Sequence, residues 1–186
     1  VQSATLCEID RSVIDLCREH FPNISDGAFE DPRTKVVIAD GTQFVAGMED
    51  RFDVILVDST DPIGPGAVLF SQAFYRDCKR ALTPGGVLVT QNGLPFLQAS
   101  ELKESVGHFR ALFNDASAYM ATTPSYFGDA MAFGWATNER SLRDSTQVAI
   151  ERRYEEAGAF STRYWNPCVH VAAFALPNYV RDLVEP

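Results

Sequence analysis

The sequence predicts an α/β protein built on a doubly wound, mostly parallel sheet, and two observations carry this prediction. Short apolar runs alternate with stretches whose apolar residues recur at helical spacing. Two of the runs, residues 35–39 and 52–57, are almost continuously apolar, as is typical of buried parallel strands, and each ends at an aspartate. Because ligands of such sheets bind at the carboxyl ends of the strands, the residues there are the first candidates for a site.

The first half of the chain begins with a strand and a helix. Residues 3–9 form an apolar run, and residues 11–20 carry apolar side chains at helical spacing until Phe21-Pro22 ends the helix. Residues 23–34 are rich in Asn, Asp, Gly and Pro, which predicts a surface loop before the strands at 35–39 and 52–57.

The second half continues the alternation and ends in an antiparallel hairpin. The expected elements are a helix over 71–82 ended by Thr-Pro-Gly-Gly, a strand over 87–91, a helix over 97–113, hairpin strands over 116–122 and 130–137, a helical pattern over 139–157, a short strand over 169–174 and a helical turn near Pro177. We expect one domain over 1–186. Because Val1 is not a methionine and lies just before a strand, we also expect that an N-terminal part, including the first sheet strand, is missing.

Composition limits the classes of function. An apolar share of 46%, a charged share of 22% and a mean hydropathy of −0.10 are typical of a folded globular protein. The net charge of −9 opposes a nucleic-acid role and favours small cationic partners. No apolar run approaches the roughly 18 residues that a membrane span needs. Cys7, Cys17, Cys78 and Cys168 form no CxxC pair, which predicts buried, reduced thiols in a cytoplasmic protein.

The expected strand ends hold four acids and one amide. Glu8 is a candidate for holding ribose hydroxyls, because a carboxylate accepts two donors at once; the alternative is an exposed acid at a helix start. Asp10 directly precedes a helix and is expected to be its N-cap. Asp40-Gly41 could bind an adenine amino group or form only a turn.

The strongest motif is DSTDPIGP at residues 58–65, in which Asp58 and Asp61 stand three residues apart on a loop stiffened by two prolines. Three interpretations remain open. The carboxylates could cap N–H groups of their own loop, or bind a divalent metal, although the sequence shows no clustered third ligand. They could also hold an ammonium group through charge-assisted hydrogen bonds.

The motifs together resemble the spermidine synthases, especially the bacterial ones. The resemblance rests on DSTDPIGP at 58–65, EID at 8–10, DG at 40–41, QNG at 91–93 and TPSYFG at 123–128, and it extends through YWNP at 164–167. It implies a fold of the AdoMet-methyltransferase type. It also implies transfer of an aminopropyl group from decarboxylated S-adenosylmethionine, a co-substrate, to putrescine, giving spermidine and methylthioadenosine without a metal or resident cofactor.

The resemblance also implies a role for each matching position. Asp58 would be the catalytic residue facing the attacking amine, with Asp61 anchoring the other end of the diamine and Gln91 and Tyr126 positioning it. Glu8 would bind the donor's ribose. The remaining donor contacts would come from Asp40 and Gly41 at the adenine and from Ser59, Pro65 and Leu69 lining its pocket. Relatives are commonly homodimers or tetramers.

Two departures from the family pattern keep other functions open. The glycine-rich GGGDG-type motif and the small N-terminal β-domain of relatives have no counterpart here, and Asn92-Gly93 stands where some relatives have Gly-Glu. Putrescine, cadaverine, agmatine and spermidine all remain possible acceptors. The alternatives are an AdoMet-dependent methyltransferase and an inactive fragment of the transferase; an NAD-dependent dehydrogenase is disfavoured because GxGxxG is absent.

Overall fold

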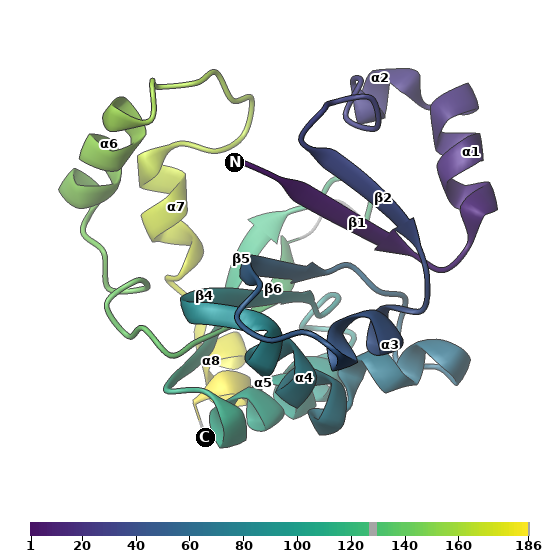
Figure 1. Cartoon of the computed structure of the whole chain (residues 1–186). Coiled ribbons are helices and arrows are strands. Elements are labelled where there is room, and N and C mark those ends of the chain that lie inside the picture. The colour runs from purple at the N-terminus through teal and green to yellow at the C-terminus, as the bar shows by residue number, and fades with distance from the viewer. Residues whose placement is uncertain (127–129, 186) are drawn as a thin grey trace. The chain divides into compact units, whose positions relative to one another are not determined.

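The computed structural model describes residues 1–126 and 130–185 and divides into two compact units, Val1–Met48 and Glu49–Pro186 (Figure 1). Each unit has its own sheet, of two strands in the first and four in the second. A single domain over 1–186 stays a prediction. Within the described residues, no helix has the length and apolar character needed to cross a membrane.

The first unit pairs two parallel strands. Its elements are β1 (Ala4–Glu8), α1 (Arg11–His20), α2 (Pro22–Ser25), β2 (Thr34–Ile38) and α3 (Gly41–Ala46). In the parallel ladder Ala4 lies opposite Thr34 and Glu8 opposite Ile38, so both strands end at the same edge. Asp10 is the N-cap of α1, as predicted: its carboxylate accepts the Ser12 N–H at 2.8 Å.

The second unit holds a mixed four-stranded sheet in the order β3-β4-β6-β5. Its elements are β3 (Phe52–Val57), the 3-10 helix η1 (Gly64–Phe70), α4 (Gln72–Ala81), β4 (Leu82–Gln91), α5 (Ala99–Leu112), β5 (Asp115–Thr122), β6 (Ala130–Thr137), α6 (Gln147–Glu156), α7 (Pro167–Ala173) and α8 (Asn178–Val184). β3 and β4 are parallel, and β6 is antiparallel to both β4 and β5. The predicted hairpin is therefore confirmed.

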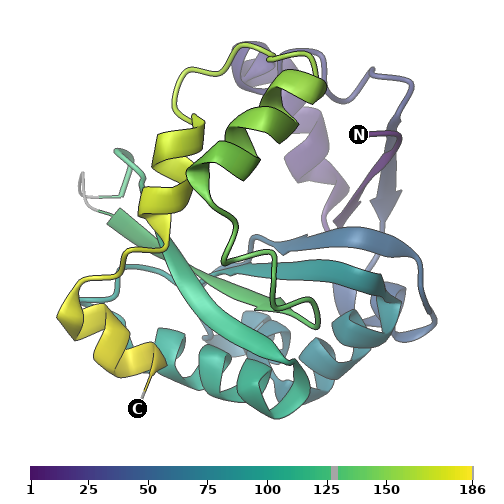
Figure 2. The same ribbon diagram turned by 90° about the vertical axis from the view of Figure 1, so that its left-hand side faces the viewer.

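The core of the second unit lies on one face of its sheet. Helices α4, α5 and α8 cover this face, and α7 lies against the opposite one (Figures 1 and 2). Tyr75, Leu88, Phe109 and Val180 are fully buried here, and the rings of Tyr75 and Phe109 meet edge to face with centroids 4.7 Å apart. Burying a large apolar side chain contributes about 1.5–3 kcal/mol, so this core holds β4 and α5 firmly in place.

Several local predictions are wrong. The expected strand over 169–174 is helix α7, because the Asn166 side chain caps the N–H of Val169 at 2.9 Å and Pro167 occupies the first helical position. β4 begins at Leu82 and not at residue 87; a register shift in its pairing with β3 and the positive φ of Gly85 (81°) let the strand continue through the Thr-Pro-Gly-Gly segment.

Three further differences concern helices and burial. The 23–34 loop and the Asp-Gly turn were expected without helices, yet α2 and α3 form there; α3 begins where Asp40 caps it. The strand at 52–57 is not buried, since Val54 and Leu56 are 53% and 72% exposed and the helices of its unit pack on β4, β5 and β6. Burial of all four thiols is also wrong: Cys78 is buried, Cys7 and Cys17 are half-buried, and Cys168 is exposed.

Candidate active site

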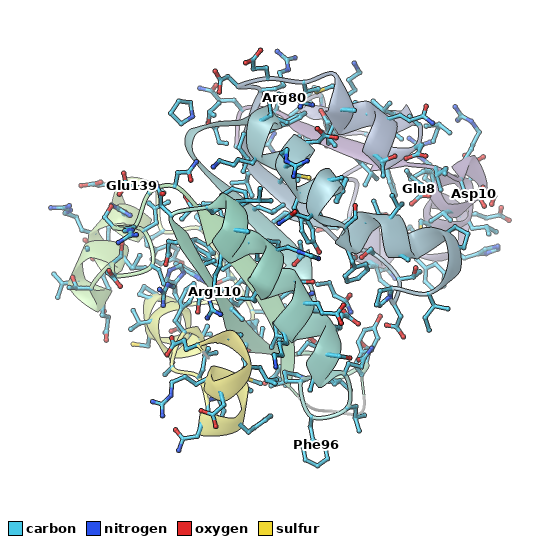
Figure 3. All side chains as sticks on the ribbon, turned by 90° about the horizontal axis from the view of Figure 1, so that it is seen from below. Glu8, Asp10, Arg80, Phe96, Arg110 and Glu139 are labelled. Carbon is cyan, nitrogen blue, oxygen red and sulfur yellow. The ribbon has the colours of Figure 1, made fainter. Side chains whose placement is uncertain are left out.

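The first unit places Glu8 and Asp40 at one edge of its sheet. Glu8 ends β1, and its carbonyl accepts the Ala39 N–H at 3.0 Å, immediately before Asp40. The Glu8 carboxylate also accepts the Asp10 N–H at 2.9 Å, and Figure 3 labels both side chains where β1 passes into α1. One Glu8 oxygen is thereby oriented by the backbone. The other has no hydrogen-bond partner among the described residues.

Asp40 is an N-cap whose carboxylate is held in its charged form. Its Oδ1 accepts hydrogen bonds from the N–H of Thr42 at 2.8 Å and from the Thr42 hydroxyl at 2.7 Å, and these bonds hold the pKa of Asp40 below its usual value. A Cβ built on Gly41 would meet nothing within 4 Å. The glycine is therefore not required by packing within the described chain, and it leaves space beside the carboxylate.

The second unit brings Asp58, Gln91 and Tyr126 to one cavity. β3 and β4 are parallel with Val57 opposite Thr90, so the next residues along each strand, Asp58 and Gln91, emerge side by side. Both line a cavity of about 370 Å³ together with Tyr126. The rest of the lining is mainly apolar and aromatic: Leu56, Val57, Val89, Tyr119, Thr123, Met131 and Phe133.

This cavity combines an apolar wall with hydrogen-bond acceptors. Tyr119 and Phe133 stack with ring centroids 5.2 Å apart and form one wall. Gln91 Oε1 is buried and has no hydrogen-bond partner among the described residues. Leaving a buried acceptor unpaired costs about 1–3 kcal/mol, which a bound N–H group would recover. A carboxylate, an amide oxygen that can accept a hydrogen bond and an apolar wall together suit an alkylamine ligand.

Asp61 follows Asp58 by three residues in the sequence, but it does not line this cavity. Its Oδ1 accepts a hydrogen bond from Gln98 Nε2 at 3.0 Å. Neither Asp58 nor Asp61 caps an N–H of its own loop with its side chain in the part of the chain that the structure describes. In the same residues no group of three His, Cys, Asp or Glu side chains is placed to hold a metal ion.

The other predicted residues remain untested by this geometry. Ser59, in the loop after β3, and Pro65 and Leu69, on η1, do not line the cavity at Asp58. Phe127 and Gly128 of the TPSYFG motif lie outside the described residues.

Sequence reasoning missed two side chains at the start of α5, Gln98 and Glu101. Gln98 is the partner of Asp61, and Glu101 is 6% exposed. Burial, and then the charge of Asp61, raise the pKa of Glu101 to about 7. A signal was present in the pattern, because Glu101 stands four residues before buried Ser105 and eight before buried Phe109, on the inward face of the helix.

Comparison with known proteins decides the family. The model of the spermine/spermidine synthase domain matches residues 1–146, a span that includes all of the predicted site residues. The chain belongs to this family. Curated relatives include polyamine aminopropyltransferase 1 of Pseudomonas aeruginosa, 49% identical over 184 residues, and polyamine aminopropyltransferase of Ruegeria sp., 50% identical over 183 residues. The matched segments span 64% of the length of each relative. They span 99% of this chain for the Pseudomonas aeruginosa protein and 98% for the Ruegeria protein.

Solved structures of family members share the fold. The match to a spermidine synthase in complex with the transition state analogue AdoDATO has a TM-score of 0.87 at 33% identity and covers 99% of this chain and 61% of that one. The spermidine synthase of Thermotoga maritima matches with a TM-score of 0.85 at 32% identity, covering 99% and 60%. The predicted α/β, Rossmann-like fold class is thereby confirmed.

Proposed function

We propose that this family member transfers an aminopropyl group from decarboxylated S-adenosylmethionine to putrescine, giving spermidine and methylthioadenosine. The observation that carries the proposal is the cavity at the ends of β3 and β4. Asp58, Tyr126 and the Gln91 oxygen, which is unpaired among the described residues, meet there over apolar walls. The names of the curated relatives support the same reaction. Both substrates are small molecules, and the donor is a co-substrate and not a resident cofactor.

In this reaction Asp58 acts on the attacking amine. The amine nitrogen forms a bond to the aminopropyl carbon beside the sulfonium, the carbon–sulfur bond breaks, and its electron pair stays on sulfur as methylthioadenosine. Proton transfer from an ordinary alkylammonium to an ordinary aspartate is uphill by about 9 kcal/mol, so a carboxylate alone does not suffice. Holding amine and carbon in line contributes about 7–11 kcal/mol, and we assign Asp58 both orientation and acceptance of the amine's proton.

The remaining acceptor contacts follow from the cavity. Gln91 Oε1 would accept a hydrogen bond from an N–H of the same amine. Tyr126 would pack against the alkyl chain of the diamine. Asp61, held by Gln98, would pair with the ammonium at the diamine's other end. The apolar lining suits the chain of methylene groups between the two nitrogens.

The donor contacts are proposed at the positions that the sequence analysis singled out. Glu8 keeps one carboxylate oxygen for ribose hydroxyls, and Asp40, charged at neutral pH, would accept from the adenine amino group beside the open space at Gly41. Ser59, Pro65 and Leu69 would line the adenine pocket. We further propose a homodimer or tetramer located in the cytoplasm, which light scattering and cell fractionation would test.

The experiment measures product formation from decarboxylated S-adenosylmethionine and putrescine by mass spectrometry. It uses the chain itself and a chimera in which the chain replaces the matching segment of the Pseudomonas aeruginosa relative. We expect methylthioadenosine and spermidine in equal amounts, at least from the chimera. A folded chimera that binds neither substrate would contradict the proposal, as would one that methylates an acceptor from S-adenosylmethionine and forms no methylthioadenosine.

A further inference from the structure

Glu101 is a buried acid with an unsatisfied oxygen. The residue is 6% exposed, and its Oε1 is buried without a hydrogen-bond partner in the described part of the chain. Its Oε2 lies 3.5 Å from Gln98 Nε2. Acids are rarely this buried without a paired cation, so the position of Glu101 in the first turn of α5 needs a reason beyond packing.

The amide of Gln98 joins Glu101 to Asp61. Nε2 lies 3.0 Å from Asp61 Oδ1, while Oε1 accepts the N–H of Leu94 at 3.0 Å. The Leu94 donor therefore determines which end of the amide faces the two carboxyl groups. Gly93 makes room for this arrangement, since a Cβ there would come within 2.3 Å of Gln98 Oε1.

The charges in this cluster are unbalanced without a ligand. Asp61, from the loop after β3, is the charged group that acts on Glu101, and the other titratable neighbour is the phenol of Tyr75 on α4. Burial raises the pKa of Tyr75 well above its usual value, so that phenol stays neutral. Two carboxyl groups thus face one neutral amide, and a cation beside Asp61 would favour the ionised form of Glu101.

We propose that Glu101 is a positioning residue for the acceptor, which acts through the Gln98 amide to hold the Asp61 carboxylate and adds a second negative charge behind the terminal ammonium group of the diamine. The inference rests on the proposed function and deepens it. It assigns Glu101 to diamine binding and not to the chemical step. Because ionised Glu101 attracts the cation, diamine binding strengthens as pH rises through about 7.

The test compares Glu101→Gln, Glu101→Asp and the matched control Glu104→Gln, an exposed acid on the same helix. In the active protein, chain or chimera, we expect Glu101→Gln to raise KM for putrescine roughly three- to tenfold at pH 8, with kcat within about twofold. It should also remove the fall of KM between pH 6 and pH 8. Glu101→Asp should keep that fall, and Glu104→Gln should match the unmodified protein.

Each other outcome counts against the inference. A KM for putrescine in the unmodified protein that does not fall between pH 6 and pH 8 overturns it, whether or not the variants fold. An unchanged pH profile in folded Glu101→Gln, or a loss confined to kcat, does the same. Failure of the proposed function is distinct, because the unmodified protein would then form no methylthioadenosine with any diamine.

Discussion

The side-chain amide of Gln98 donates a 3.0 Å hydrogen bond to the carboxylate of Asp61, 37 residues earlier in the chain. The contact ties the segment before α5 to the DSTDPIGP loop after β3. Asp61 is exposed and lies on a loop, so this bond is what orients its carboxylate among the described residues. A residue outside the recognisable motif thereby positions one inside it.

Replacing Gln98 by Ala should therefore weaken diamine binding. Asp61 would lose its partner, and the Leu94 N–H would lose its acceptor. We expect KM for putrescine to rise about three- to tenfold with a small change in kcat, since a typical hydrogen bond contributes about 0.5–1.5 kcal/mol net of its exchange with water. Steady-state kinetics checks this. The control is Gln147→Ala, whose amide donates to Glu151 on the exposed side of α6, away from the DSTDPIGP loop in sequence; the KM of this variant should not change.

Gly93 should not tolerate a side chain. Its φ is +65°, and a Cβ would lie 2.3 Å from Gln98 Oε1. Gly93→Ala should lower the free energy of unfolding by about 1–3 kcal/mol and raise KM for putrescine through displaced Gln98. Gly107→Ala is the matched comparison, because a Cβ in the middle of α5 meets nothing within 4 Å; it should stabilise by about 0.5–1 kcal/mol. Urea unfolding measures both, and equal effects of the two variants would contradict the account.

Much of the fold follows from local patterns. Residues 11–20, 52–57 and 130–137 were predicted as a helix and two strands, and α1, β3 and β6 have these same bounds. The strand expected over 169–174 failed because Val169 and Val171 favour a strand locally, whereas the capping by Asn166 decides for a helix.

The candidate site could likewise be predicted from the sequence only in part. Asp58 and Gln91 could be placed together because parallel strands end at one edge of a sheet. Asn92-Gly93, in contrast, departs from the family pattern, and only the packing of the folded chain shows what Asn92 does. Asn92 is fully buried, donates to Ser105 at 2.9 Å and accepts the Gly134 N–H at 3.0 Å, contacts that join residues far apart in the chain. Burial of Glu101 likewise depends on such long-range packing.

The raised pKa of Glu101 predicts how stability changes with pH. An acid whose pKa is about 7 when folded, above the roughly 4.3 of an unfolded chain, binds more protons in the folded state between those values. Its contribution to the free energy of unfolding therefore falls as pH rises from about 4 to 7, and we expect the fall to be about 1–3 kcal/mol. Glu101→Gln should be more stable than the unmodified protein at pH 8, with the difference shrinking towards pH 5. Urea titrations at both pH values measure it, and a difference independent of pH would refute the assignment.

The most direct test of the central claim is the turnover of Asp58→Asn with saturating putrescine and decarboxylated S-adenosylmethionine, measured as methylthioadenosine release. If Asp58 orients the amine and accepts its proton, kcat should fall by about 10²- to 10⁴-fold. Asp182→Asn, an exposed acid on α8, should keep full activity. A folded Asp58→Asn variant whose kcat stays within a fewfold of the unmodified protein would contradict the role of Asp58 and the proposed mechanism with it.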